Sequence, residues 1–214
     1  MRKIITTGLI LFSTTVLFAE DVKDLNTALK VSTLGVGLDI STPINDTFSA
    51  RFNVNGAAYS KNETSNGNSY SGTLTLFTAG VLLDTYPFEN KFRLSTGIYY
   101  NGNNFTGTAI DKVTINGTTY NISDIGKVDA DITFNKIAPY IGIGWGNTTK
   151  DKGWGFTFDL GALYHGKGEV DLTSERGNSP RINEGLAKEE VKINDELADN
   201  KIYPVVALGV NYTF

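Results

Sequence analysis

The chain has 214 residues, a formal net charge of −4 and no cysteine. An acidic chain of this length suits a single domain, and it is a poor partner for nucleic acid, whose phosphates attract basic surfaces. The absence of cysteine excludes disulfides, thiol catalysis and thiolate metal sites, so stability must come from secondary structure and burial.

The amino-terminal segment has the pattern of a secretory signal peptide. Arg2 and Lys3 precede an apolar stretch over residues 4–18 that is interrupted by threonine and serine. This stretch is too short and too polar to form a stable transmembrane helix. No later segment has enough uninterrupted apolar residues for a spanning helix. We therefore predict a signal peptide over residues 1–19 and one domain over residues 20–214.

Alternation of apolar and polar residues with a period of two predicts β-strands through most of this domain. Over residues 154–164 an apolar side chain, often a large aromatic one, stands at every second position, as on a lipid-facing wall with interfacial aromatic girdles. An exported chain without a spanning helix can satisfy its backbone in lipid only as a closed barrel, so we predict an all-β, antiparallel up-and-down transmembrane barrel. The outward series is Trp154, Phe156, Phe158, Leu160, Ala162 and Tyr164.

Seven strands can be placed, separated by alternately short and long connections. Barrels of this kind usually have an even number of strands with both ends in the periplasm. Either residues 20–30 thread the lumen, or one strand is hidden, most plausibly within the long connections, and we predict eight strands. The seven are at residues 29–40, 48–55, 73–86, 92–100, 130–145, 154–164 and 203–214.

Two of these strands have ambiguous faces. In the strand over 73–86, two sets of apolar residues compete for the outer face, so its facing stays unassigned. In the strand over 130–145, the apolar residues change parity near Pro139, which predicts a β-bulge that shifts the register by one residue.

In the first strand, Leu34 is predicted on the same apolar face as Val36.

The three long connections are predicted to lie outside the membrane. Residues 60–72 are rich in Asn, Ser and Gly and predict a solvated loop. Residues 101–127 contain an expected hairpin around Asn116-Gly117, a dipeptide that favours tight β-turns. Within 166–201, loosely helical spacing of apolar residues over 183–200 predicts one short helix on or over the barrel mouth.

Four charged residues fall on the polar faces of the predicted strands and are expected in the lumen. They could line a pore, or they could neutralise one another. An interior of about eight strands is just wide enough for side chains to fill, and unpaired buried charges are costly. We therefore favour an ion-paired plug formed by Asp39, Arg51, Arg93 and Asp159.

The last strand ends on an aromatic residue, with Gly209, Tyr212 and Phe214 at its carboxyl end. This arrangement resembles the carboxyl-terminal assembly signal of small Gram-negative outer-membrane β-barrel proteins, the group of the OmpA, OmpX and OmpW barrels, although Ala207 stands where a polar residue is usual. The resemblance implies an outer-membrane location, insertion by the barrel insertion machinery, and lipid with lipopolysaccharide as surroundings. It implies no reaction.

The candidates for catalysis are few. His165 is the only histidine, and Lys167 stands where some lipid A-trimming barrel enzymes carry a serine. We predict no enzyme, no cofactor, no metal site and a monomer in the outer membrane. The leading hypothesis is a structural or narrow-channel barrel with exposed external loops. The alternatives are a surface-binding, adhesin-like barrel, a lipid-modifying enzyme, and a soluble lipocalin-like barrel with its apolar face inward.

Overall fold

The computed structural model describes residues 24–65, 68–88, 90–146, 152–176 and 179–214. The predicted signal peptide, residues 1–19, lies outside the described residues and stays a prediction.

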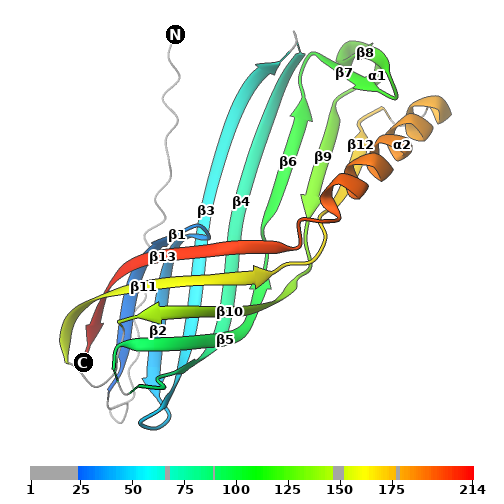
Figure 1. The fold of residues 1–214 in the computed structure, drawn as a ribbon. Helices are drawn as coiled ribbons and strands as arrows, with labels where there is room; N and C mark the ends of the chain where they lie inside the picture. The colour runs from blue at the N-terminus through cyan, green and yellow to red at the C-terminus, as the bar shows by residue number, and fades with distance from the viewer. Residues whose placement is uncertain (1–23, 66–67, 89, 147–151, 177–178) are drawn as a thin grey trace, which may run out of the picture.

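Eight of the described strands pair in a closed antiparallel ring (Figure 1). Their order around the ring is the same as their order along the chain. A closed ring of this kind is an up-and-down barrel, in agreement with the predicted all-β fold and the predicted eight strands. The ring is formed by β1 (Asn26–Ser32), β2 (Gly35–Pro43), β3 (Phe48–Ser65), β4 (Asn68–Thr85), β5 (Phe92–Asn101), β10 (Ile137–Trp145), β11 (Gly153–Tyr164) and β13 (Ile202–Thr213).

The strand that the sequence did not reveal is β1. The segment over 29–40, predicted as one strand, is split by a tight turn in which Gly35 has a φ of +104°, a conformation that favours glycine. Residues 26–32 therefore neither thread the lumen nor belong to a long connection. Leu34 lies at this turn, 1 % exposed, and points into the interior, so its predicted place on the outer face was wrong.

Above the barrel, the wall continues on one side as an external sheet in the order β3, β4, β6, β9, β12 (Figure 1). The hairpin β7–β8 confirms the predicted turn, with positive φ at Asn116 and Gly117. A helix is present close to the predicted range, and the described residues contain a second, shorter one. These elements are β6 (Asn104–Ala109), β7 (Lys112–Ile115), β8 (Thr118–Asn121), α1 (Ile122–Ile125), β9 (Val128–Thr133), β12 (Glu169–Ser174) and α2 (Pro180–Leu197).

None of the described helices is both long enough and apolar enough to cross a membrane.

The predicted solvated loop over 60–72 is wrong, because most of these residues belong to the long β3–β4 hairpin. The ladder runs from Phe48 opposite Thr85 up to Ser65 opposite Asn68. Polar Asn, Ser and Thr residues suit a strand here because both faces of this upper part lie outside the hydrocarbon.

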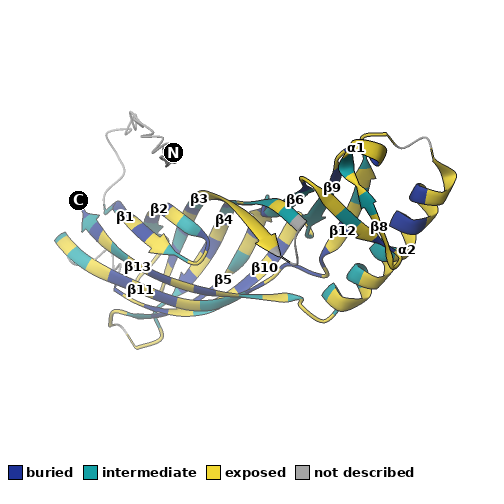
Figure 2. Cartoon of the chain, turned by 90° about the horizontal axis from the view of Figure 1, so that it is seen from above, coloured by how far each residue is buried: buried dark blue, intermediate teal, exposed yellow. Residues whose placement is uncertain are grey.

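The apolar face of the sheet changes sides where β3 and β4 leave the barrel. Within the barrel, exposed and buried residues alternate along the strands (Figure 2). The exposed, outer residues are mostly apolar and the buried, inner ones largely polar. Higher up, the outer face becomes polar and the inner face apolar. On β4 the outer series reads Leu83, Val81, Ala79, Phe77, then Thr75, Thr73, Ser71, while the inner one ends in Leu76 and Leu74. This inversion marks the boundary between hydrocarbon and water.

The same inversion explains the two ambiguous strands. Over 73–86, one apolar set lies on the outer face within the barrel and the other on the inner face above it. A single apolar face could therefore not be assigned to the whole strand. The predicted strand over 130–145 is two strands, β9 and β10, separated by residues 134–136, and even-numbered residues point inward in both. The predicted bulge at Pro139 is therefore wrong: the apolar face changed sides and the register did not slip.

Replacing Leu160 with Arg should destabilise the barrel by about 2–4 kcal/mol, because Leu160 is exposed near the middle of β11, at the expected depth of the hydrocarbon. Tyr164→Arg, at the external end of the same strand, should cost about 1 kcal/mol or less. Urea titration of protein refolded into lipid vesicles measures both. An equal loss of stability in the two variants would indicate that the outer face of β11 does not lie in a membrane.

Candidate functional site

The structure places the four predicted lumen charges together in the barrel interior. Asp39 lies on β2, Arg51 on β3, Arg93 on β5 and Asp159 on β11, and each is at most 3 % exposed. Two further buried charges, Lys30 on β1 and Asp84 on β4, join them, which makes three cations and three anions. The six side chains are called the lumen plug below.

Ion pairs connect all six members of the plug. Asp159 and Arg51 each pair with three members of the plug: Lys30 Nζ lies 2.6 Å from Asp159 Oδ2, and Arg93 Nη2 lies 2.5 Å from Asp159 Oδ1. Arg51 Nε lies 2.8 Å from Asp84 Oδ2, and Arg51 Nη1 lies 3.2 Å from Asp39 Oδ2. Lys30 also pairs with Asp39. Because the charges balance and every member is paired, the cost of removing them from water is offset within the lumen.

Sequence reasoning missed Lys30 and Asp84 for identifiable reasons. Lys30 lies on the unrecognised strand β1. The signal for it was a change of parity, since Leu29 and Val31 stand at odd positions whereas Val36 and Leu38 stand at even ones. Asp84 lies on β4, whose faces could not be assigned before the inversion was known.

Neutral polar groups complete the hydrogen bonding of the plug. Ser95 Oγ donates to Asp84 Oδ1 at 2.5 Å and accepts from Arg51 Nη2 at 2.9 Å. On the periplasmic side, Arg93 donates to the carbonyl of Gly146 and to Thr157 Oγ1. These contacts satisfy guanidinium protons that the carboxylates do not reach.

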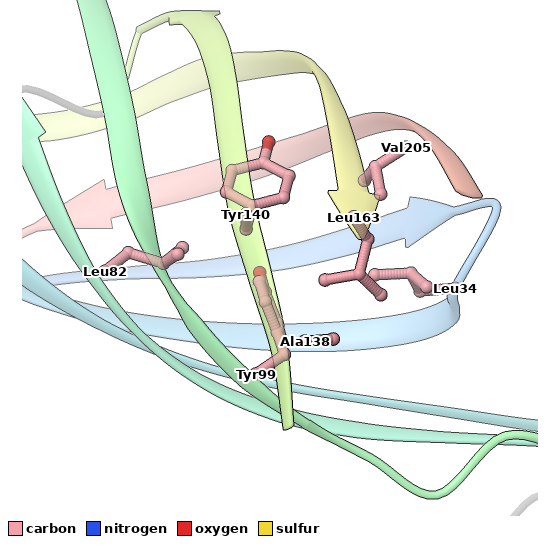
Figure 3. Close-up of a cluster of buried hydrophobic side chains, with 7 residues drawn as sticks. All are labelled: Leu34, Leu82, Tyr99, Ala138, Tyr140, Leu163 and Val205. Carbon is pink, nitrogen blue, oxygen red and sulfur yellow. The ribbon is translucent and has the colours of Figure 1, made fainter. Parts of the chain in front are cut away.

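An apolar layer lies in the barrel interior on the external side of the plug. Figure 3 shows its side chains. Its side chains come from β4, β5, β10, β11, β13 and the β1–β2 turn, and they point into one interior region. The rings of Tyr99 and Tyr140 meet edge to face with centroids 5.5 Å apart. The layer consists of Leu34, Leu82, Tyr99, Ala138, Tyr140, Leu163 and Val205.

Glycines on the inner wall make room for the large side chains of the interior. A Cβ at Gly144 would lie 2.7 Å from Arg93 Cζ and 2.8 Å from Asp159 Oδ1. A Cβ at Gly161 would lie 2.6 Å from Tyr140 Cζ. The glycine content that the sequence shows within strands therefore has a packing role.

The lumen has little remaining space. The cavity between the plug and the apolar layer has a volume of about 20 Å³, roughly enough for one water molecule. Within the described part of the chain, no group of His, Cys, Asp and Glu residues is suited to hold a metal ion. The side chains of the described residues can therefore block the lumen.

His165 lies just above the end of β11, away from the plug. Its ring packs edge to face on Phe134, with centroids 4.4 Å apart, and burial lowers its pKa, so the imidazole is neutral at pH 7. Its Nδ1 atom has no hydrogen-bond partner among the described residues. The residue has the environment of a packing residue at the barrel rim.

The three residues of the predicted assembly signal lie on β13 or just after it. Tyr212 packs against Trp154 and Phe214, with ring centroids 5.2 and 4.9 Å apart. The Phe214 amide donates to the Leu25 carbonyl at 3.0 Å, which ties the chain end to the start of β1. Gly209 lies close to Lys30 in the ladder. Recognition of these residues by the insertion machinery stays a prediction.

Comparison with solved structures shows that the fold is similar to those of two Acinetobacter baumannii proteins. CarO2 of Acinetobacter baumannii has 25 % sequence identity and a TM-score of 0.60, with 89 % of this chain and 98 % of that chain covered. CarO of the same organism has 23 % identity and a TM-score of 0.58, with 88 % and 97 % covered. Both are outer-membrane β-barrel proteins. The chain is an outer-membrane β-barrel protein.

Other comparisons add less. A major outer membrane protein from Thermus thermophilus has 14 % identity and a TM-score of 0.47, covering 89 % of this chain and 99 % of that chain, and this looser likeness adds nothing to the assignment. No protein-family model and no curated protein matches the chain. The outer-membrane location, predicted from the sequence, is confirmed; the narrower resemblance to the OmpA, OmpX and OmpW group is not specifically supported.

Replacing Asp159 with Asn should destabilise the protein by about 3–5 kcal/mol, because Lys30 and Arg93 would lose a shared buried carboxylate. Denaturant titration in detergent micelles measures the change. Glu63→Gln is the matched control: Glu63 pairs with Lys61 on the exposed part of β3, where water screens the pair, so its loss should leave the denaturation midpoint unchanged. An Asp159→Asn variant as stable as the wild type would show that the plug contributes little.

Proposed function

We propose that this protein is a closed structural barrel that does not form an open pore. The barrel would anchor an external module in the outer membrane, and this module consists of β6 to β9, β12, α1 and α2. The observation that carries the proposal is the lumen plug with its apolar layer, which together fill the interior of the eight-stranded ring. An ion entering the lumen would have to displace buried, paired charges and then cross an apolar layer, and both steps are unfavourable.

The proposal includes no catalytic step. His165 packs between aromatic rings, and its Nδ1 has no partner among the described residues that would orient it as a general base. The plug carboxylates are paired and out of reach of a substrate. We also propose that the barrel is monomeric and reaches the membrane through the barrel insertion machinery, for which the terminal aromatic residues are the supporting feature.

A second candidate function, surface binding by the external module, is favoured by one observation. The module has a hydrophobic core of its own, separate from the barrel interior, in which α2 and the β7–β8 hairpin cover the inner face of the external sheet. A segment that only connected strands would not need such a core. Its members are Ala109, Ile115, Ile125, Val128, Ile182 and Leu186.

Planar-bilayer recording tests the closed lumen. The wild-type protein should give no stepwise conductance. The double variant Arg51→Ser/Asp84→Ser removes one cation and one anion, leaves two charges of each sign, and opens space in the plug. Combined with Tyr99→Ser, which opens the apolar layer as well, this variant should pass ionic current where the wild type does not. Stable steps from the wild type would contradict the proposal and favour a narrow channel.

Opening the module core should leave the barrel intact. Ile182→Asp buries a carboxylate at a position that is 6 % exposed, so α2 should detach and residues 104–133 should become sensitive to protease. Heat-modifiable migration on a detergent gel should persist. Val191→Asp, on the same helix at 61 % exposure, should behave like the wild type. Loss of heat-modifiability in Ile182→Asp would show that module and barrel form one folding unit.

A further inference from the structure

A row of apolar side chains runs across the inner face of the external sheet, above the barrel mouth. Each member lies directly opposite the next one on a neighbouring strand, so all of them point to the same side of the sheet. The row is therefore one continuous apolar stripe that faces the barrel axis. From β3 to β12 its members are Tyr59, Leu74, Phe105, Ile132 and Val170.

One half of this row is covered and the other half is exposed. At the β12 end, where α2 lies beside the sheet (Figure 1), Val170 is buried, and its amide donates to Asn194 Oδ1 of α2 at 2.9 Å. At the β3 end, Tyr59 is 64 % exposed, Leu74 39 % and Phe105 38 %. Large apolar side chains that are exposed together outside the membrane mark a binding surface.

The exposed half has the dimensions of one helix. It spans two strand spacings between β3 and β6, about 10 Å, and six residues along β4 from Leu76 to Tyr70, about 20 Å. An α-helix is about 10 Å wide and rises about 1.5 Å per residue, so roughly 14 residues would cover the surface. The middle of the surface is flat, because the Phe105 ring lies against Gly72 and Gly107. The 18-residue helix α2 already packs on the other half of the same face.

Two lysines lie at the barrel mouth, below this surface. The Lys136 carbonyl accepts a hydrogen bond from the Asn101 amide, and the Lys201 carbonyl accepts one from the His165 amide. Each lysine therefore lies opposite a buried inner residue and faces the barrel axis. Over the described part of the chain, no ion pair involves either lysine. Two such cations attract a negative group, and the carboxyl end of a helix carries partial negative charge.

We propose that the exposed half of this face binds an amphipathic helix of a partner protein, with the carboxyl end of the helix over Lys136 and Lys201. The apolar side of the helix packs on Tyr59, Leu74 and Phe105, as α2 packs on the other half. A second copy of the chain does not supply this helix, because α2 is held in the core of its own module and the other described helix, α1, has four residues. The inference rests on surface binding, the second candidate function, and is independent of the closed lumen.

The test places a fluorescent label on either face of one strand. Ala57 and Ala58 are adjacent exposed residues of β3 that point to the inner and the outer face, and the chain has no cysteine that would compete for the label. Ala57→Cys and Ala58→Cys, each carrying an environment-sensitive dye, are prepared in lipid nanodiscs. The probe is a stapled amphipathic peptide of about 14 residues with a free terminal carboxylate. It should shift the emission of the label at position 57 and leave that at position 58 unchanged.

A second set of variants, made in the Ala57→Cys background, tests the apolar contact. Leu74→Ser/Phe105→Ser should weaken binding of the peptide roughly tenfold or more, because the helix loses its apolar partners. The control Val191→Ser removes an exposed apolar side chain from α2 and should match the parent protein. Heat-modifiable migration checks that each variant is folded.

A third set tests the orientation of the helix. The parent protein should prefer the peptide with a free carboxylate to the same peptide with a terminal amide. Lys136→Gln/Lys201→Gln should remove this preference, whereas the control Lys188→Gln/Lys192→Gln, which removes two lysines of α2, should keep it.

Four outcomes would overturn the proposal. These are an equal shift at positions 57 and 58, an equal shift with a scrambled peptide of the same composition, unchanged binding by Leu74→Ser/Phe105→Ser, and an unchanged preference in Lys136→Gln/Lys201→Gln. A shift at position 57 that grows with protein concentration in the absence of peptide would also overturn it, because a second copy would then cover the face. None of these results bears on the closed lumen, which planar-bilayer recording tests separately.

Discussion

Closure of the strand ladder between β1 and β13 is the constraint on which the rest of the structure depends. In hydrocarbon, an open strand edge would leave backbone amides and carbonyls without partners, and each would cost several kcal/mol. Residues 26–32 pair on one side with 207–213 and on the other with β2, so the ring has no edge. The pairing also places both ends of the ring on the same side of the membrane.

Closure with eight strands fixes what the interior can hold. The lumen is narrow, and the inner faces supply six charges together with two tyrosines, so these groups must share one small volume. Balanced pairing removes the electrostatic penalty, and glycines such as Gly144 and Gly161 remove the steric one. The apolar layer then separates the paired charges from external water, which strengthens their mutual attraction. The lumen contents are thus part of the folding core.

The sequence predicts this fold best where a strand has one solvent on each side for its whole length. The outer series from Trp154 to Tyr164 and the last strand fulfil this condition, and their predicted faces agree with the structure. The predictions fail where a strand passes from hydrocarbon into water, as β4 does between Phe77 and Thr75, because a pattern of period two does not report which solvent it faces. The same limit hid Asp84 and produced the mistaken bulge at Pro139.

The candidate sites differ in the same way. Four plug charges could be predicted because they alternate with lipid-facing residues, whereas Lys30 required the turn at Gly35 to be recognised first. The core of the external module could not be predicted as one cluster, because its residues come from two connections that are distant in sequence and meet only through the order of the ring.

The division of the module core between two connections has a consequence for biogenesis. Ile115 and Val128 come from the connection between β5 and β10, and Ile182 and Leu186 from the one between β11 and β13. Both stretches must be translocated across the bilayer before their side chains can meet, so neither can be transported as a prefolded unit. The core of the module can therefore form only after both connections have reached the same side of the membrane.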